Sequence, residues 1–424
     1  MMNLQRIRAN FPALGLLDDG QPRIYLDNPG GTQVARQVLD RMQHYLVHTN
    51  ANTGGAFATS RATDNCLGEA HAAMADLLNA ASPDEIVFGQ NMTSLTFAIS
   101  RSLAQGWQRG DELIVTRLDH DGNVAPWLAV AADRGMTVKW LDVNPEDCTL
   151  RTDQLQQLLS PRTRMVAVGY ASNAVGTVNP VTEIAAQVHA AGALLFVDAV
   201  QWVAHGPTDV QTLGADLLAC SAYKFFGPHQ GVLWGRQELL DRLPAYKVRP
   251  APDRGPGKFE TGTQSHEGAA GVLGAVDYFE WLGQHEGTAH AAKFAHLQGR
   301  RQTLASALAA IQDDERTLSE QLVAGLQGIP GVQVYGITDA RQFARRVATV
   351  SFTLEGYLPS QVAQELGARN IHVWDGNYYA VELVERLGLA QHGMVRIGAV
   401  HYNTPREIDR VLQAVNDLAA RRRR

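Results

Sequence analysis

Cysteine is scarce in this chain, which has three among its 424 residues, at positions 66, 148 and 220. They are widely spaced, form no CxxC pair and have no paired histidines beside them, so the usual zinc-binding patterns are absent. A small, odd count is typical of a reducing compartment rather than of a disulfide-stabilised secreted domain. We therefore expect no metal site and no disulfide framework.

Long hydrophobic runs are also lacking. No stretch of ~18 apolar residues could span a bilayer, and the opening MMNLQRIRANFPAL has no apolar segment long enough for a signal peptide. A net charge of −6 gives no basic surface for nucleic acid. With 45% hydrophobic and 19% charged residues, the composition is that of a folded globular protein. We expect a cytoplasmic protein with neither nucleic-acid nor membrane partners.

Short apolar runs rich in β-branched residues recur along the first part of the chain. They cover residues 85–88, 113–116, 138–141, 165–169, 194–198, 217–220 and 231–234. Most are apolar throughout, which predicts strands of a mostly parallel sheet covered on both faces by helices. Amphipathic stretches lie between them, one with Leu67, Ala70, Met74, Leu77 and Leu78 on a single helical face and another from 181 to 191. The alternation from about 84 to 235 predicts a large doubly wound α/β domain.

The pattern changes after the Pro- and Gly-rich passage 244–257. Helices are predicted at 289–311, 318–326 and 404–420, with strands at 346–353 and 394–400. We expect an N-terminal arm of the small domain at 1–24, a large domain at 25–289 and a small α+β domain at 290–424.

Lysine is the scarce cation: five occur, and only Lys224 directly follows a buried-looking strand, in LLACSAYKFFGPHQG. The plain interpretation is a surface lysine in a loop. The functional one is a desolvated lysine, which loses its proton readily and becomes a nucleophile towards an aldehyde. The local sequence leaves both open.

Polar side chains also follow three other predicted strands. Asp198 ends the run LLFVDAVQ, with Gln201 three residues on, and His120 follows the strand that ends at Thr116. Carboxyl ends of parallel strands are where open α/β sheets bind ligands. Thr93 and Ser94 lie where a strand passes into a helix, so they could bind a phosphate at the helix N-terminus, although helix capping alone would explain a threonine there.

A nicotinamide dehydrogenase is the other plain interpretation of a doubly wound sheet. It needs a GxGxxG turn after an early strand, with an acidic residue ~20 positions later. Neither GGT at 30–32 nor GG at 54–55 supplies that turn.

Eight motifs, taken in order, resemble the cysteine desulfurase and selenocysteine lyase branch of the class V aminotransferases. They are YLDNPGGTQ, the Thr93 turn, HDGNVAPW, SNAVGTVNP, VDAVQ, SAYKFFGP, FETGTQ and VRIGAVHYNT. The match runs from about Ile7 to the closing helix. It implies the pyridoxal 5′-phosphate (PLP) fold type I, with a large domain built on a mostly parallel seven-stranded sheet and a smaller α+β C-terminal domain.

The resemblance also implies residue roles. Lys224 would hold PLP as a Schiff base and act with His120 as a catalytic residue, His120 stacking on the ring. Asp198 would contact the pyridine nitrogen and Gln201 the phenolic oxygen. The implied phosphate ligands are Thr93, Ser94, Ser221 and Tyr223, with Thr263 reaching across from the partner subunit of a homodimer that shares its active sites. Asn173, Arg396 and Gly30 would surround the substrate, the arginine offering a fork for its carboxylate.

The chain departs from the family at the loop that carries the sulfur-accepting cysteine. Here that region reads NIHVWDGNYYAVELVERLGLAQHGMVRIG, without cysteine and with Trp374, Tyr378 and Tyr379. Cys66 lies in a helical stretch, Cys148 in a surface-like turn and Cys220 at the end of a buried strand, so none replaces it easily. Tyr223 stands where the family usually has histidine, and NTGGAFATSRAT replaces a His-Arg pair.

We therefore expect a PLP enzyme acting at the α-carbon of a small amino acid, by transamination or by β-elimination. Transamination comes first as the general reaction of the fold. Desulfuration with a non-standard sulfur acceptor, as in a cysteine desulfurase or selenocysteine lyase, is the alternative. A non-catalytic PLP-binding scaffold is an alternative of another class, although Lys224, Asp198, His120 and Arg396 are all present.

Overall fold

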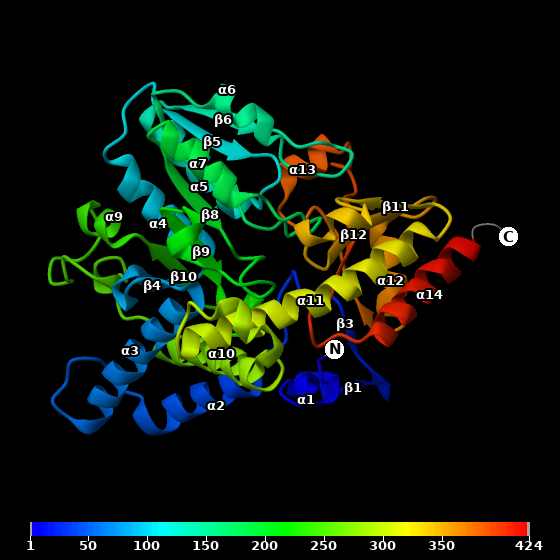
Figure 1. Ribbon diagram of the computed structural model, residues 1–424, viewed down its shortest axis with the longest axis horizontal. Helices are drawn as coiled ribbons and strands as arrows, with labels where there is room; N and C mark the ends of the chain where they lie inside the picture. The colour runs from blue at the N-terminus through cyan, green and yellow to red at the C-terminus, as the bar shows by residue number, and fades with distance from the viewer. Residues whose placement is uncertain (1, 422–424) are drawn as a thin grey trace.

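A computed structural model describes residues 2–421, and its centre is a seven-stranded sheet (Figure 1). The strand order is β4-β10-β9-β8-β7-β5-β6. The strands are β4 (Ile86–Gly89), β5 (Glu112–Thr116), β6 (Thr137–Leu141), β7 (Thr163–Gly169), β8 (Leu194–Asp198), β9 (Leu217–Ser221) and β10 (Gly231–Gly235). Only β10 runs antiparallel to its neighbours β4 and β9. The predicted mostly parallel sheet and its seven strands are confirmed.

Helices cover both faces of this sheet because alternate side chains of each strand point to opposite sides. Ile114, Val166 and Leu218 join one apolar core, together with residues from α3 (Ala58–Leu78), α7 (Val181–Ala190) and α10 (His266–His285). Leu113, Met165 and Leu217, one position earlier in each strand, join a second core with α4 (Met92–Ala104) and α5 (Ala125–Arg134). The result is the expected three-layer large domain.

The small domain is built on a four-stranded antiparallel sheet in the order β11-β12-β15-β14. Its strands are β11 (Val332–Tyr335), β12 (Thr349–Leu354), β14 (Trp374–Gly376) and β15 (Met394–Gly398). Helices α12 (Pro359–Gly367) and α14 (Pro405–Arg421) contribute to its core. The predicted strands at 346–353 and 394–400 and the closing helix are therefore present.

A single helix, α11 (Arg300–Gln327), takes the place of the two helices predicted at 289–311 and 318–326. Residues 288–294 form a 3-10 helix. Gly299, with φ of 59°, immediately precedes α11, and this single helix continues without interruption past residues 311 and 318. The stretch QDDERT in between contains no glycine or proline to interrupt it. Leu304 and Ile311 pack in the large core and Leu318 and Leu326 in the small one, so α11 joins the two domains (Figure 1).

The N-terminal segment contacts residues of both domains. Ile7 and Phe11 lie in the large core, where Phe11 makes an edge contact with Phe226 at 5.5 Å. The chain then enters the small domain, where β3 (Ile24–Tyr25) pairs in parallel with β13 (Ile371–His372). The ring centre of Phe11 also lies 4.7 Å from that of Tyr402, and Arg8 donates to the Tyr402 carbonyl at 2.8 Å. Residues 1–24 therefore contact both domains, and the boundary at residue 24 stays a prediction.

The remaining elements are short or peripheral. They are α1 (Leu4–Arg8), α2 (Arg36–His44), α6 (Leu155–Leu158), α8 (Val210–Leu213), α9 (Gln237–Arg242), α13 (Val381–Arg386), β1 (Leu17–Asp18) and β2 (Gln21–Pro22). None of the helices in residues 2–421 has the length and apolar content needed to cross a bilayer. The turn at Cys148 is exposed at Pro145 and Glu146, as expected, but Cys148 itself, with φ of 52°, is buried, and its thiol lies against the backbone of Gly336.

Candidate active site

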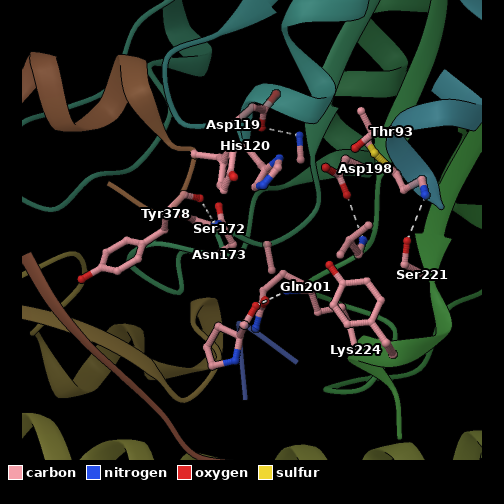
Figure 2. Close-up of a pocket in the computed structure, with 18 of the residues that line it drawn as sticks. Thr93, Asp119, His120, Ser172, Asn173, Asp198, Gln201, Ser221, Lys224 and Tyr378 are labelled. Carbon is pink, nitrogen blue, oxygen red and sulfur yellow. Dashed lines mark hydrogen bonds between the residues drawn. The ribbon is translucent and has the colours of Figure 1, made fainter. Parts of the chain in front are cut away.

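A cavity of about 720 Å³ opens where the carboxyl ends of the large sheet meet the small domain (Figure 2). The structure places ten of the predicted site residues on its wall: Gly30, Thr93, His120, Asn173, Asp198, Gln201, Ser221, Tyr223, Lys224 and Arg396. Two are not there. Ser94 and Thr263 lie outside this wall, and Thr263 is exposed at the surface of its own chain.

Lys224 follows β9 in a single 3-10 turn and points into the cavity. Its Nζ donates to the carbonyl of Pro29 and lies 4.7 Å from the centre of the Tyr223 ring. Burial, together with the nearby Arg396, lowers the pKa of this lysine to about 7, although Asp27 and Asp198 act in the opposite direction. A substantial fraction of the amine is therefore neutral near pH 7, as a nucleophile requires.

Asp198 ends β8 at the base of the cavity and is buried. Its Oδ1 accepts from the backbone N–H of Val200 at 2.9 Å. Burial raises the pKa of this carboxyl to about 6, against the backbone hydrogen bond and Lys224, which lower it. A cationic ring nitrogen placed beside it would favour the ionised form.

Gln201 lies three residues further on, in the turn that follows β8, and only its amide nitrogen is hydrogen-bonded. Its amide nitrogen lies 3.3 Å from Thr349 Oγ1 and 3.2 Å from His205 Nε2. The amide oxygen is buried and has no hydrogen-bond partner among the described residues. Buried polar groups are normally paired, so an unpaired one on a cavity wall marks a place for a ligand atom. Turning the amide over would present its NH₂ to that ligand.

His120 is held as a neutral ring. Its Nδ1 accepts from the backbone N–H of Gly122 at 2.9 Å, and its ring stacks on Tyr379 with centres 5.3 Å apart. Burial lowers the pKa of His120 to about 4, with smaller contributions from Lys224 and Arg396. The proton of the neutral ring is therefore on Nε2.

The N-terminus of α4 forms a small polar cradle beside Lys224. Asn91 caps the helix by accepting from Ser94 N–H at 2.8 Å, while the hydroxyl of Ser94 turns back to Asn91. This capping box explains why Ser94 does not reach the cavity. Ser221 Oγ accepts from Met92 N–H at 3.0 Å, and Thr93 lines the cavity. Gly122 lies so close that a Cβ there would be 2.8 Å from Thr93 Oγ1.

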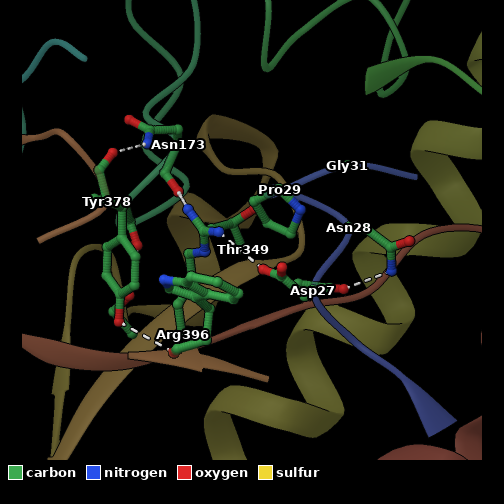
Figure 3. A network of polar contacts seen from close by, with 12 residues as sticks. Asp27, Asn28, Pro29, Gly31, Asn173, Thr349, Tyr378 and Arg396 are labelled. Carbon is green, nitrogen blue, oxygen red and sulfur yellow. Dashed lines mark hydrogen bonds and ion pairs between the residues drawn. The ribbon is translucent and has the colours of Figure 1, made fainter. Parts of the chain in front are cut away.

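Arg396 occupies the opposite wall, on β15 of the small domain (Figure 3). One guanidinium nitrogen donates to the carbonyl of Asn173 at 3.1 Å and the other to Asp27 Oδ1 at 2.9 Å. The ring of Tyr378 lies 4.3 Å from its guanidinium carbon. Arg396 Nε and Asn173 Oδ1 are buried without a partner in the described chain. These two atoms can bind a carboxylate and an amine, respectively.

Three ionisable wall residues were missed from the sequence: Asp27, Asp119 and His229. Asp27 lies within YLDNPGG, and Gly30 is required beside it because a Cβ would be 2.3 Å from Asp27 Oδ2. His229 stacks on Tyr223 at 4.8 Å. A motif scan could have flagged Asp27 and Asp119, which adjoin predicted site residues, but the ring contact of His229 depends on tertiary structure.

Comparison with known proteins places the chain in a family. The family model for class V aminotransferases matches residues 24–305 and 285–411. The aminotransferase-like protein FGM3 of Gibberella zeae is 34% identical over 97% of this chain and 98% of its own, and a cysteine desulfurase of Dickeya dadantii is 32% identical over 98% and 96%.

Solved structures agree with this placement. A cysteine desulfurase of Thermococcus onnurineus superposes with a TM-score of 0.85 at 26% identity, covering 99% of both chains. The Escherichia coli cysteine desulfurase CsdA gives 0.82 at 27%, again over 99% of both chains. The unpaired atoms of Gln201, Asn173 and Arg396 and the cradle at Thr93 fit the polar groups of PLP and an amino acid. This chain therefore belongs to the cysteine desulfurase-like branch of the class V aminotransferases and is a PLP-dependent enzyme.

Proposed function

We propose that the protein acts at the α-carbon of a small amino acid by transamination or β-elimination, without a protein persulfide. The observation that carries this proposal is the composition of the cavity wall. Lys224, His120, Asp198 and Arg396 share one cavity, and none of the described residues lining it is a cysteine. Transamination stays first, as the general reaction of the fold.

The wall residues divide between cofactor and substrate. Lys224 holds the cofactor aldehyde, Asp198 faces the pyridine nitrogen, Gln201 the phenolic oxygen, and His120 stacks on the ring. Thr93, Ser221 and Tyr223 bind the phosphate. PLP, when bound, takes up the electron pair left at the substrate α-carbon after a proton leaves.

Proton transfer falls to Lys224. The free amine of Lys224, with a pKa of about 7, would accept the substrate α-proton and return it. Arg396 supplies a planar fork for the substrate carboxylate, and Asn173 lies beside it. Together they orient the α-carbon towards the lysine.

The cysteines support a reaction without a protein thiol. Cys220 and Cys148 are fully buried, and burial raises the pKa of each thiol. Cys66 lies within α3, away from the cavity wall, and its thiol pKa is also raised by burial. A thiol must ionise to attack sulfur, so these three are poor acceptors. The alternative, favoured by the named desulfurase relatives, is desulfuration with an acceptor supplied from outside.

We also propose a cytoplasmic homodimer that shares its active sites. The exposed position of Thr263, outside the cavity of its own chain, supports a role at the partner's phosphate site. Exposed apolar side chains at Leu46, Val47 and Phe57 supply a surface for the partner to cover. The three free cysteines fit a reducing compartment.

The test is an absorbance spectrum of the PLP-reconstituted protein and of Lys224→Ala. We expect a visible band from the lysine-bound cofactor that the variant lacks. Cysteine, alanine and cysteine sulfinate are then added. Formation of pyridoxamine phosphate indicates transamination, whereas pyruvate with sulfide or sulfite indicates elimination. A wild-type protein without the band would overturn the proposal and leave the non-catalytic scaffold.

A further inference from the structure

Two consecutive tyrosines on the cavity wall have an unusual backbone conformation. Tyr378 and Tyr379 have φ of 55° and 60°, in the left-handed region that bulky side chains rarely occupy. Such residues persist only where surrounding contacts hold them, and they cluster at functional sites. The pair lies between β14 and α13, in the loop that departs from the family pattern.

Polar contacts fix this loop to the catalytic groups. The Tyr378 carbonyl accepts from Asn173 Nδ2 at 2.8 Å, and its hydroxyl donates to the carbonyl of Met394. The Tyr379 carbonyl accepts from Asp121 N–H at 2.7 Å. The ring of Tyr379 stacks on His120 but is still 69% exposed. The loop therefore presents this ring to the cavity in a fixed position.

Trp374 extends the aromatic surface. It is paired directly with Arg396 across the β14–β15 ladder, so the two side chains leave the sheet on the same side. Trp374 lines the cavity and is 60% exposed. A substrate whose carboxylate is bound to Arg396 thus has apolar ring surface next to it.

The charges on the wall exclude a second acidic group. Among the described lining residues, Lys224 and Arg396 are the only lysine and arginine. The first is used by the cofactor and the second by the α-carboxylate, which leaves no fixed positive charge for an acidic side chain. Asp27, at 2.9 Å from Arg396, already supplies a negative charge there, and the cofactor phosphate adds more. An additional carboxylate would be desolvated without a partner, which is costly.

We propose that the substrate is an amino acid with a neutral, apolar side chain, and that Tyr379 and Trp374 form the surface that binds this side chain. The inference rests on the proposed function, because it takes Arg396 as the site of the α-carboxylate. It adds the substrate class and the residues that select it.

Two isosteric acids test the class on the PLP-loaded protein. Succinate and 4-methylpentanoate differ in a terminal carboxylate against an isopropyl group, and neither has an amine to react with the cofactor. Titration calorimetry gives the Kd of each without turnover. We expect 4-methylpentanoate to bind at least about tenfold more tightly than succinate. Equal binding, or tighter binding of succinate, would overturn the inference.

Substitutions at Tyr379 test whether this residue produces the preference for 4-methylpentanoate over succinate. Tyr379→Ala should weaken 4-methylpentanoate by about three- to tenfold with little change for succinate, and Tyr379→Phe should restore binding. Tyr246→Ala is the matched control, since Tyr246 is 62% exposed and outside the cavity wall. A Tyr379→Ala protein with unchanged affinity for both acids contradicts the assignment.

Arg396→Gln distinguishes a failure of the proposed substrate class from a failure of the proposed function on which it rests. If the variant weakens both acids, the carboxylate site stands and the preference between the acids decides the substrate class. If it weakens neither, or if neither acid binds the wild type, the carboxylate role of Arg396 fails and the substrate class falls with it. The visible cofactor band is read in the same samples, so loss of PLP binding is recognised separately.

Discussion

At the scale of single residues, the ionisation of Lys224 depends on neighbours from three distant parts of the sequence. Arg396 lowers its pKa, whereas Asp27 and Asp198 raise it, and burial has the largest effect. A free amine is needed to attack the cofactor aldehyde. Lysine ordinarily loses its proton only at about pH 10.4, so this environment supplies a neutral amine near pH 7, as the proposed attachment of PLP to Lys224 requires.

The rate at which PLP attaches to the apoprotein should therefore rise with pH, with a midpoint near 7. The sign follows from deprotonation: below the midpoint Lys224 is an ammonium and cannot attack. Stopped-flow absorbance after mixing apoprotein with PLP measures the profile.

Two neighbours of Lys224 that shift its pKa in opposite directions provide controls for this pH profile. Arg396→Gln should move the midpoint upward, because Arg396 lowers the pKa of Lys224, and Asp27→Asn should move it downward. A wild-type midpoint above about 9, close to that of an ordinary lysine, would contradict the desolvated environment.

At the scale of elements, α11 contributes one buried acid that connects both domains. Glu315 Oε2 bonds His205 Nδ1 at 2.6 Å, and its Oε1 accepts from His401 N–H at 3.1 Å. His205 follows β8 of the large domain and in turn contacts Gln201. His401 follows β15 of the small domain. Through His205, the helix thereby supports Gln201, a side chain on the cavity wall.

Glu315→Ala should destabilise the protein by about 3–5 kcal/mol, because it leaves buried polar partners without an acceptor. Glu315→Gln, which keeps the shape and one acceptor oxygen, should cost less. Urea denaturation followed by circular dichroism measures both. Glu320 on the same helix is the control: its side chain is 50% exposed, so Glu320→Ala should change stability by no more than about 0.5 kcal/mol. Similar losses for Glu315→Ala and Glu320→Ala would refute the buried link.

At the scale of the whole molecule, the strands of the large sheet were predicted more accurately from the sequence than the segments that connect the two domains. Apolar runs mark buried strands directly, so β8 was placed at its observed bounds, and Lys224 and Asp198 followed from strand ends. Periodicity could not show that α11 continues through a polar stretch, since exposed turns of a helix resemble loops. Likewise, the ring contact of His229 and the burial of the Cys148 thiol depend on contacts between segments far apart in sequence.

The proposed dimer is the prediction at this scale. Val47 is 66% exposed, and an acidic side chain placed at a covered apolar surface would be desolvated without a partner. Val47→Asp should therefore shift the protein from dimer towards monomer in sedimentation velocity. Val248→Asp, at a position 62% exposed outside that patch, is the control. A wild-type protein that sediments as a monomer would disprove the shared active site.

Helix α11 runs through both domains (Figure 1) and contributes to both apolar cores, so we expect the gap between Lys224 and Arg396 to be set during folding rather than on arrival of a ligand. The two groups are carried by different sheets, yet neither sheet can rotate away without bending a helix packed at both ends. In the proposed function, an amine and a carboxylate that enter the cavity would therefore meet partners already at their working separation. Little domain ordering remains to oppose binding, which is how preorganisation raises affinity.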